Sequence, residues 1–177
     1  RFPGEVLRFA LLSAHYRSAL NFSGELLTSA RGTLDTFYGA LRRHADVEPT
    51  MLNVTDSRVL LALLDDMNTP EAIAALHAAA STLNKSDDPE EIAMAKAELT
   101  VGGQLLGILD ADPEAWFTDA VGEEGPTGEE IDALIEERIA AKANRDFERA
   151  DQIRDDLEAL GVVLEDGPDG TQWRRRS

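Results

Sequence analysis

Residues 145–176 read RDFERADQIRDDLEALGVVLEDGPDGTQWRRR, and this stretch predicts a helix followed by a β-hairpin. Apolar side chains recur at helical spacing up to Leu160, and Gly161 is the residue type that most often ends a helix in the left-handed conformation. Two strand-forming runs, 162–165 and 171–174, flank the turn sequence GPDG. Because an isolated hairpin is only marginally stable in water, we expect this one to pack on the preceding helices.

The sequence before this stretch predicts helices almost throughout. Apolar residues recur at helical spacing in three segments, which are 4–20, 23–41 and 57–65. Thr69, Asp88 and Asp112 each precede a proline, which predicts that their side chains cap three further helices. Thr127 and Glu130 have the spacing of a capping box ahead of another helix.

The segment GEEGP at 122–126 is the best candidate for a linker. We therefore predict a mostly α-helical chain with a helical bundle at 1–122, a linker at 123–130 and a small α/β domain at 131–177 that holds two helices and a β-hairpin. A chain of 177 residues can bury about 70% of its unfolded surface, which suffices for one domain with a small appendage.

The composition excludes several kinds of site. Hydrophobic side chains make up 43% and charged ones 29%, as in a soluble globular protein, and no apolar run reaches the roughly 20 residues that span a bilayer. The sequence has no Cys, which excludes disulfides, thiolate metal sites and thiol catalysis within these residues. His15, His44 and His77 lie too far apart for a zinc site of their own. We expect no metal ligand in this chain.

No catalytic motif is visible either. No glycine-rich phosphate loop with a following Lys occurs. The carboxylate pairs at 65–66 and 87–88 are candidates for Mg²⁺, but such pairs far more often end or cap helices. We therefore expect no catalytic residue here.

The net charge of −17 argues against a protein that binds nucleic acids through charge alone. The distribution of charge weakens this objection, because residues 1–43 carry +3, residues 44–130 carry −16 and residues 131–177 carry −4. Both end regions can still present cationic faces, whereas a phosphate backbone would avoid the centre.

Two segments stand out as candidate contacts to a nucleic acid. The first is 7–23, whose polar face offers Arg8, His15 and Arg17, although the solvated face of a core helix would look the same. The second is 142–176, where cations surround Phe147 and Trp173. Aromatic rings among cations suit base stacking with phosphate contacts, but the two rings could equally be hairpin core. The residues alone leave both interpretations open.

Three motifs resemble the cysteinyl-tRNA synthetase family in its bacterial form. They are GEVLRFALLSAHYR at 4–17 with LNFS at 20–23, LDDMNTPE at 64–71, and LEDGPDGTQWRR at 164–175. Their order and spacing are similar to those of the family, and the resemblance covers essentially the whole chain.

The resemblance implies a bundle of the DALR type that binds the anticodon stem, followed by a small anticodon-recognition domain. It places the family's catalytic domain before Arg1, with a Rossmann-like fold, HIGH-type and KMSKS-type ATP motifs and a Cys/His zinc site. None of those motifs occurs here. The chain is thus expected to be the tRNA-binding C-terminal region of a class I ligase, inactive alone, with ATP and zinc bound only by the absent domain. The implied partner is tRNA(Cys), and the implied state is a cytoplasmic monomer without membrane contact.

The resemblance also assigns roles to individual residues. Matched by motif position, the residues that would read the anticodon GCA are Lys142, Phe147, Asp151, Arg154 and Asp166. The family more typically has Arg in place of Lys142 and Trp in place of Phe147, so this chain lacks one planar fork and some stacking area. Contacts to the tRNA backbone are expected from Arg8, His15, Arg17, Arg174 and Arg175. Trp173 is assigned to hairpin packing.

Two alternatives come from other classes of protein. One is a free-standing module that uses the same fold to bind RNA or protein. The other is an acidic interaction scaffold, whose central segment of charge −16 would bind a basic partner. RNA binding would weaken steeply with salt, whereas a scaffold would not bind RNA.

Overall fold

The structure is a computed structural model that describes residues 2–118, 126–167 and 170–175. The chain divides into two compact units, Phe2–Pro113 and Glu114–Ser177. Residues 123–125 of the linker expected at 123–130 lie outside the described residues, and its last three residues, 128–130, already belong to a helix. The predicted domain boundaries therefore stay predictions.

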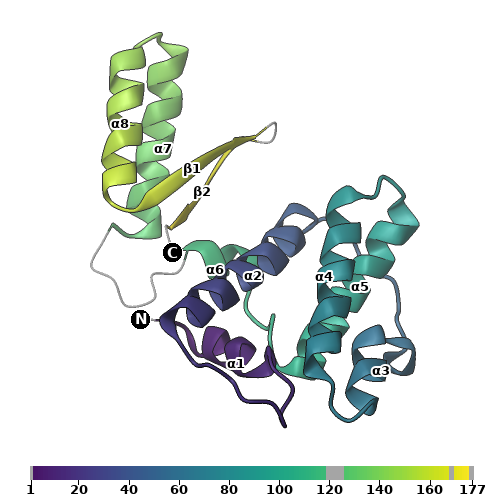
Figure 1. Ribbon diagram of the computed structural model, residues 1–177. Helices are drawn as coiled ribbons and strands as arrows, with labels where there is room; N and C mark the ends of the chain where they lie inside the picture. Colours follow the sequence, from purple (N-terminus) through teal and green to yellow (C-terminus); the bar gives the residue numbers. More distant parts are fainter. Residues whose placement is uncertain (1, 119–125, 168–169, 176–177) are drawn as a thin grey trace. The chain divides into compact units, whose positions relative to one another are not determined.

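The mostly α-helical fold predicted from the sequence is confirmed, with one two-stranded antiparallel sheet (Figure 1). The first unit holds α1 (Gly4–Leu12), α2 (Gly24–Arg43), the 3-10 turn η1 (Val54–Asp56), α3 (Arg58–Leu64), α4 (Thr69–Lys85) and α5 (Pro89–Leu106). The elements that follow are α6 (Pro113–Thr118), α7 (Gly128–Ala143), α8 (Phe147–Ala159), β1 (Val162–Gly167) and β2 (Gly170–Arg175). Among the described residues, no helix has the length and apolar character needed to cross a membrane.

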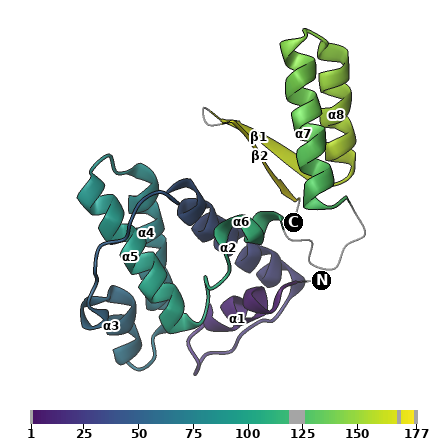
Figure 2. The same ribbon diagram turned by 180° about the vertical axis from the view of Figure 1, so that it is seen from behind.

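The bundle core depends on a close approach of α5 to α3 and α4. Helices α4 and α5 lie side by side in both views (Figures 1 and 2). A Cβ added at Gly102 of α5 would lie 2.5 Å from Val59 Cγ2 and 2.7 Å from Leu76 Cδ2. Only a glycine fits at this contact without displacing its neighbours. The largest fully buried side chains of this core are Tyr38, Phe37, Leu34, Leu76, Leu83 and Leu99.

Two charged side chains of α5, the buried Glu98 and the half-buried Lys96, fasten the connections of the bundle. Glu98 of α5 accepts hydrogen bonds from Ser57 Oγ at 3.0 Å and from the backbone N–H of Val59 at 3.1 Å, which fixes the start of α3. Lys96 donates to the carbonyl oxygens of residues 44, 45 and 47, just after α2. These bonds satisfy backbone groups that the helix ends leave open.

Two local predictions for the bundle were wrong. The first helix ends at Leu12 instead of continuing to residue 20, and Ser13 Oγ there donates to the carbonyl oxygen of Ala10 at 2.7 Å. Helix α4 is capped by Asn68, which accepts from the N–H of Glu71, and not by Thr69. The hydroxyl of Thr69 instead donates to the carbonyl oxygen of residue 14 at 3.3 Å, a contact between segments far apart in the sequence.

The second unit follows the sequence prediction closely. Thr127 and Glu130 form the expected capping box at the start of α7. Helices α7 and α8 pack side by side, and a tight turn joins them in which Arg145 has a φ of 62°. Gly161, with a φ of 77°, follows α8 as predicted. The two strands pair from Val162 opposite Arg175 to the turn, so each is slightly longer than expected.

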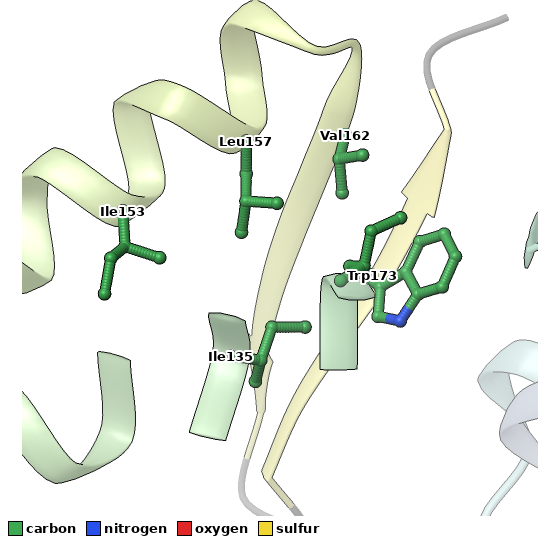
Figure 3. Packing of buried hydrophobic residues seen from close by; sticks show 6 residues of the cluster. Ile135, Ile153, Leu157, Val162 and Trp173 are labelled. Atoms are coloured by element: carbon green, nitrogen blue, oxygen red, sulfur yellow. The ribbon is translucent and has the colours of Figure 1, made fainter. Parts of the chain in front are cut away.

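The hairpin packs on α7 and α8 through one small hydrophobic core (Figure 3). Its buried members are Ile131, Ile135, Ile153, Leu157, Val162 and Trp173. Trp173 is only 6% exposed, and its indole N–H donates to Asp132 at 2.8 Å. The assignment of Trp173 to hairpin packing is therefore confirmed.

Candidate nucleic-acid interface

The five residues predicted to read an anticodon come from three elements of the second unit. Lys142 lies in the last turn of α7, Phe147 begins α8, Asp151 and Arg154 follow on α8, and Asp166 lies in β1. The structure brings Lys142 and Asp166 together, with 3.5 Å between Nζ and Oδ2. It also pairs Asp151 with Arg154 at 3.7 Å. All five side chains are exposed, as an RNA contact requires.

Asp166 is the most constrained carboxylate of this group. Arg138 donates to both of its oxygens, at 3.1 Å and 3.0 Å, and Thr171 Oγ1 donates to Oδ1 at 2.6 Å. The hydrogen bond from Arg138, followed by that from Thr171 and the nearby charges, holds the pKa of the Asp166 carboxyl well below its usual range. Its side chain nevertheless remains 54% exposed. Asp166 is therefore an ionised, oriented acceptor at the surface.

Arg138 was not predicted from the sequence as part of this group. It is only 5% exposed and lies on α7 in line with the core residues Ile131 and Ile135. A charged residue in an apolar stripe at helical spacing was the signal available in the sequence. Such a residue is stable in a core only when a partner compensates its charge, and Asp166 is that partner.

Phe147 is an aromatic side chain that the fold leaves in solvent. It stands at the first position of α8 and is 62% exposed, whereas Trp173 in the same unit is buried. The interpretation of both rings as hairpin core thus holds for Trp173 alone. An exposed aromatic ring suits stacking of a nucleobase.

Among the described residues, Arg154 makes loose surface contacts with two carboxylates of its own helix. Its guanidinium lies 3.7 Å from Asp151 and 3.3 Å from Asp155, and the side chain is 53% exposed. Pairs of this kind contribute about 0–1 kcal/mol to stability. Arg154 can therefore turn toward a ligand at small cost.

The expected backbone contacts on the bundle lie in two places. Arg8 donates to the carbonyl oxygen of Gly107 at the end of α5. His15 Nε2 lies 3.1 Å from the carbonyl oxygen of Asp66, and Arg17 is ion-paired with the carboxylate of the same residue at 3.2 Å. Tyr16 stacks on His15 and donates to Asp66 at 2.8 Å. Asp66 thus contacts both His15 and Arg17, whereas Arg8 contacts Gly107.

The two arginines after Trp173 are engaged with their own chain. Arg174 donates to Glu165 on the neighbouring strand at 2.8 Å. Arg175 lies over the ring of Trp173 and donates to the carbonyl oxygens of Thr118 and Pro126. Arg174 is thereby held against the neighbouring strand, and Arg175 is held close to the start of α7.

The described residues contain no group of three or more His, Asp or Glu side chains that could hold a metal ion. Because the sequence has no Cys, the Cys/His zinc site of the family cannot be built from this chain. The carboxylate of Asp66, a member of one candidate Mg²⁺ pair, instead binds Tyr16 and Arg17.

Comparison with known proteins identifies both units. Residues 126–174 match the family model described as the cysteinyl-tRNA ligase anticodon binding domain, and residues 58–110 match the DALR domain. The chain belongs to the cysteinyl-tRNA ligase family. The resemblance seen in the sequence motifs is thus confirmed.

Individual relatives of the family support the same conclusion. The cysteine–tRNA ligase of Caulobacter vibrioides (strain NA1000 / CB15N) is 46% identical over 181 residues, which cover 98% of this chain and 38% of the relative. The cysteine–tRNA ligase of Parvibaculum lavamentivorans is 48% identical over 97% of this chain and 37% of its own length. That of Saccharophagus degradans is 45% identical over 99% and 38%. The chain therefore spans a little over a third of the length of these relatives.

Proposed function

We propose that this chain is the tRNA-binding region of a cysteine–tRNA ligase and that the unit containing α7, α8 and the hairpin reads the anticodon of tRNA(Cys). The observation that carries the proposal is the oriented carboxylate of Asp166 beside Lys142, within the segment similar to the anticodon binding domain. Phe147 adds an exposed stacking surface on the same unit. We place the domains at 1–122 and 131–177, joined by a linker at 123–130.

Each proposed reader has a distinct physical task. Phe147 stacks on one base, while Asp151 and Asp166 accept hydrogen bonds from base N–H groups. Arg154 and Lys142 donate to base or phosphate oxygens, and only Arg154 has the fork for a two-point contact. A good two-point contact of this kind discriminates against the wrong base by about 1–3 kcal/mol.

The bundle is proposed to run along the inner side of the tRNA stem as a rigid spacer. Contacts to the tRNA backbone would come from Arg8, His15 and Arg17, and from Arg174 and Arg175 of the hairpin. Their present partners are carbonyl groups and single carboxylates at or near the surface, which phosphate oxygens can replace. The acidic centre of the sequence would face away from the RNA.

For the whole protein, the proposed reaction is the ATP-dependent attachment of cysteine to tRNA(Cys) by a class I aminoacyl-tRNA synthetase in the cytoplasm. The ATP and zinc sites are assigned to the part of the relatives that this chain does not cover. The 177-residue chain alone is expected to bind tRNA as a monomer without activating cysteine. A free-standing module or an acidic scaffold is not favoured, since the matches of both units belong to tRNA ligases.

Titration of the 177-residue chain with a tRNA(Cys) transcript tests the proposal. We expect binding that weakens steeply as salt rises, because phosphate contacts release counterions. The variant Arg154→Ala should weaken binding to the cognate anticodon more than binding to a transcript with one anticodon base changed. Equal weakening on both transcripts would reduce Arg154 to a phosphate contact, and no salt-dependent binding by the unaltered chain would overturn the proposed function.

A further inference from the structure

The donors among the described residues leave one acceptor position of the Asp166 carboxylate for a ligand. A carboxylate offers about four lone-pair positions, two on each oxygen. Arg138 and Thr171 fill those of Oδ1 at 3.1 Å and 2.6 Å, and Arg138 fills one of Oδ2 at 3.0 Å. Lys142 Nζ lies 3.5 Å from Oδ2, which is longer than the roughly 2.7–2.9 Å of a charge-assisted hydrogen bond. The open position therefore lies on Oδ2, on the side of Lys142.

Arg138 is too deeply buried to touch an RNA itself. It is 5% exposed, and its Nε has no hydrogen-bond partner among the described residues. A buried donor without a partner lowers stability, and an apolar side chain at this position would continue the stripe without that loss. Packing alone does not account for a guanidinium here. Its visible effect is to fix the plane of the Asp166 carboxylate through two parallel hydrogen bonds.

We infer that Arg138 is a positioning residue for anticodon reading, whose planar fork turns Asp166 so that one lone pair of Oδ2 accepts a single base N–H beside Lys142. This inference rests on the proposed function, because it takes Asp166 to face the anticodon. Arg138 acts through Asp166 and does not contact the base. A Lys at position 138 would keep the charge but lose the fork, so the carboxylate could rotate and accept donors in other directions.

The test measures anticodon discrimination by variants of the 177-residue chain. The probes are a synthetic hairpin of the tRNA(Cys) anticodon stem and loop with GCA, and three hairpins that each replace one of these bases. For the unaltered chain we expect weaker binding to all three. Arg138→Lys should reduce discrimination about tenfold at the one position that Asp166 reads, while the affinity for the hairpin altered there changes little.

A double-mutant comparison separates positioning from a general structural role. In the background Asp166→Ala, the change Arg138→Lys should leave discrimination unaltered, since Asp166 is the residue through which Arg138 acts. The matched control is Arg149→Lys, which removes the planar fork from the exposed ion pair between Arg149 on α8 and Glu137 on α7. This variant should discriminate at all three anticodon positions as the unaltered chain does. The carboxyl carbon of Asp166, followed by NMR, should titrate at higher pH in Arg138→Lys than in the unaltered chain.

The outcomes decide between the inference and the proposed function. If Arg138→Lys folds and discriminates as the unaltered chain does, or changes discrimination equally in the Asp166→Ala background, the inference is wrong and the proposed function stands. If the unaltered chain binds the four hairpins equally or not at all, both are wrong. If Arg138→Lys does not fold, Thr171→Val removes another of the fixing donors at the hairpin surface. It should reduce discrimination at the same position, and unchanged discrimination there would overturn the inference.

Discussion

The two units of this chain use buried charge in opposite ways. In the bundle, the buried carboxylate of Glu98 accepts hydrogen bonds from Ser57 and from the backbone of Val59, so its partners all lie within the fold. In the second unit, the buried guanidinium of Arg138 is paired with Asp166, whose side chain is half exposed. A buried charge whose partners lie inside the unit stabilises the fold. A buried charge whose partner lies at the surface holds that exposed partner in a fixed direction, which is useful for recognition.

Each unit buries some of its aromatic residues and exposes others. The bundle buries Phe37 and Tyr38 completely but leaves Tyr16 60% and Phe22 52% exposed. The second unit buries Trp173 in a core of only six residues and leaves Phe147 in solvent. By leaving Phe147 exposed while Trp116, Phe117 and Trp173 are buried, this unit gives up burial that would have added stability. The comparison predicts that stability and RNA binding depend on different residues in the second unit.

The largest expected effect is the loss of the small core. Trp173→Ala should destabilise the second unit by about 3–5 kcal/mol, because it removes a large ring and the hydrogen bond to Asp132. Amide hydrogen exchange measured along the chain should show faster exchange in α7, α8 and the hairpin, with the bundle unchanged. Trp173→Phe is the control and should lose less, since it keeps a ring. Equal destabilisation of both units would contradict this prediction.

The bundle has its own sensitive position at Gly102. Gly102→Ala should destabilise the bundle by about 1–3 kcal/mol, because the new Cβ would lie 2.5 Å from Val59 Cγ2. Gly32 is a matched control, since its added Cβ meets nothing within 4 Å on α2. Gly32→Ala should be neutral or slightly stabilising. Urea unfolding followed by far-UV circular dichroism measures both, and a stable Gly102→Ala would show that α5 can move away.

Phe147 tests whether binding and stability are separate in the second unit. Phe147→Ala should leave the thermal midpoint nearly unchanged, because the ring is 62% exposed, but weaken binding to the GCA hairpin by about 1–3 kcal/mol. Ile139→Ala removes another exposed apolar side chain, on α7, and should alter neither quantity. Phe147→Trp should strengthen binding through its larger ring. Undiminished binding by Phe147→Ala would remove it from the interface.

The smallest expected effect is a difference in the response of the two units to acid. Partial burial lowers the pKa of His77 in the bundle from its ordinary value of 6.5, so its contribution to stability is complete above pH 6.5 and is lost as the pH falls from there through the lowered pKa. The pKa of Asp166 in the second unit is lowered from an ordinary value near 4, chiefly by Arg138. Its contribution is present above about pH 4 and is lost only below it.

Hydrogen exchange measured as a function of pH distinguishes these windows. Between pH 7 and 5 the amides of the bundle should exchange slightly faster, because the contribution of His77 to stability is lost in this range. The second unit should not change in this range, because the contribution of Asp166 is lost only below about pH 4. The effect is small because His77, although its ring meets Phe37 edge to face, is partly exposed. His77→Gln should remove the bundle's dependence in this range. If hydrogen exchange in the bundle still depended on pH in that variant, a group other than His77 would be responsible.

The sequence predicted the second unit more accurately than the bundle connections. The capping box at Thr127, the left-handed Gly161 and the turn between two strand-forming runs are local signals, since each depends on residues a few positions apart. The first helix was predicted too long because its apolar spacing continues beyond Leu12. Just after this helix, residues 14–17 make contacts with Asp66 and Thr69. Asp66 and Thr69 lie about 50 positions further along the sequence, so local spacing could not predict where the helix ends.

The sequence by itself determined the order and type of the elements, the family and the residues expected to read an anticodon. It did so because helix caps, turns and motif spacing are properties of short segments. Only the tertiary structure decided which ring is buried, which is exposed, and that Arg138 meets Asp166 from 28 positions away. Those outcomes depend on how α7, α8 and the hairpin pack, because packing sets both the exposure of a side chain and the partner available to a buried charge.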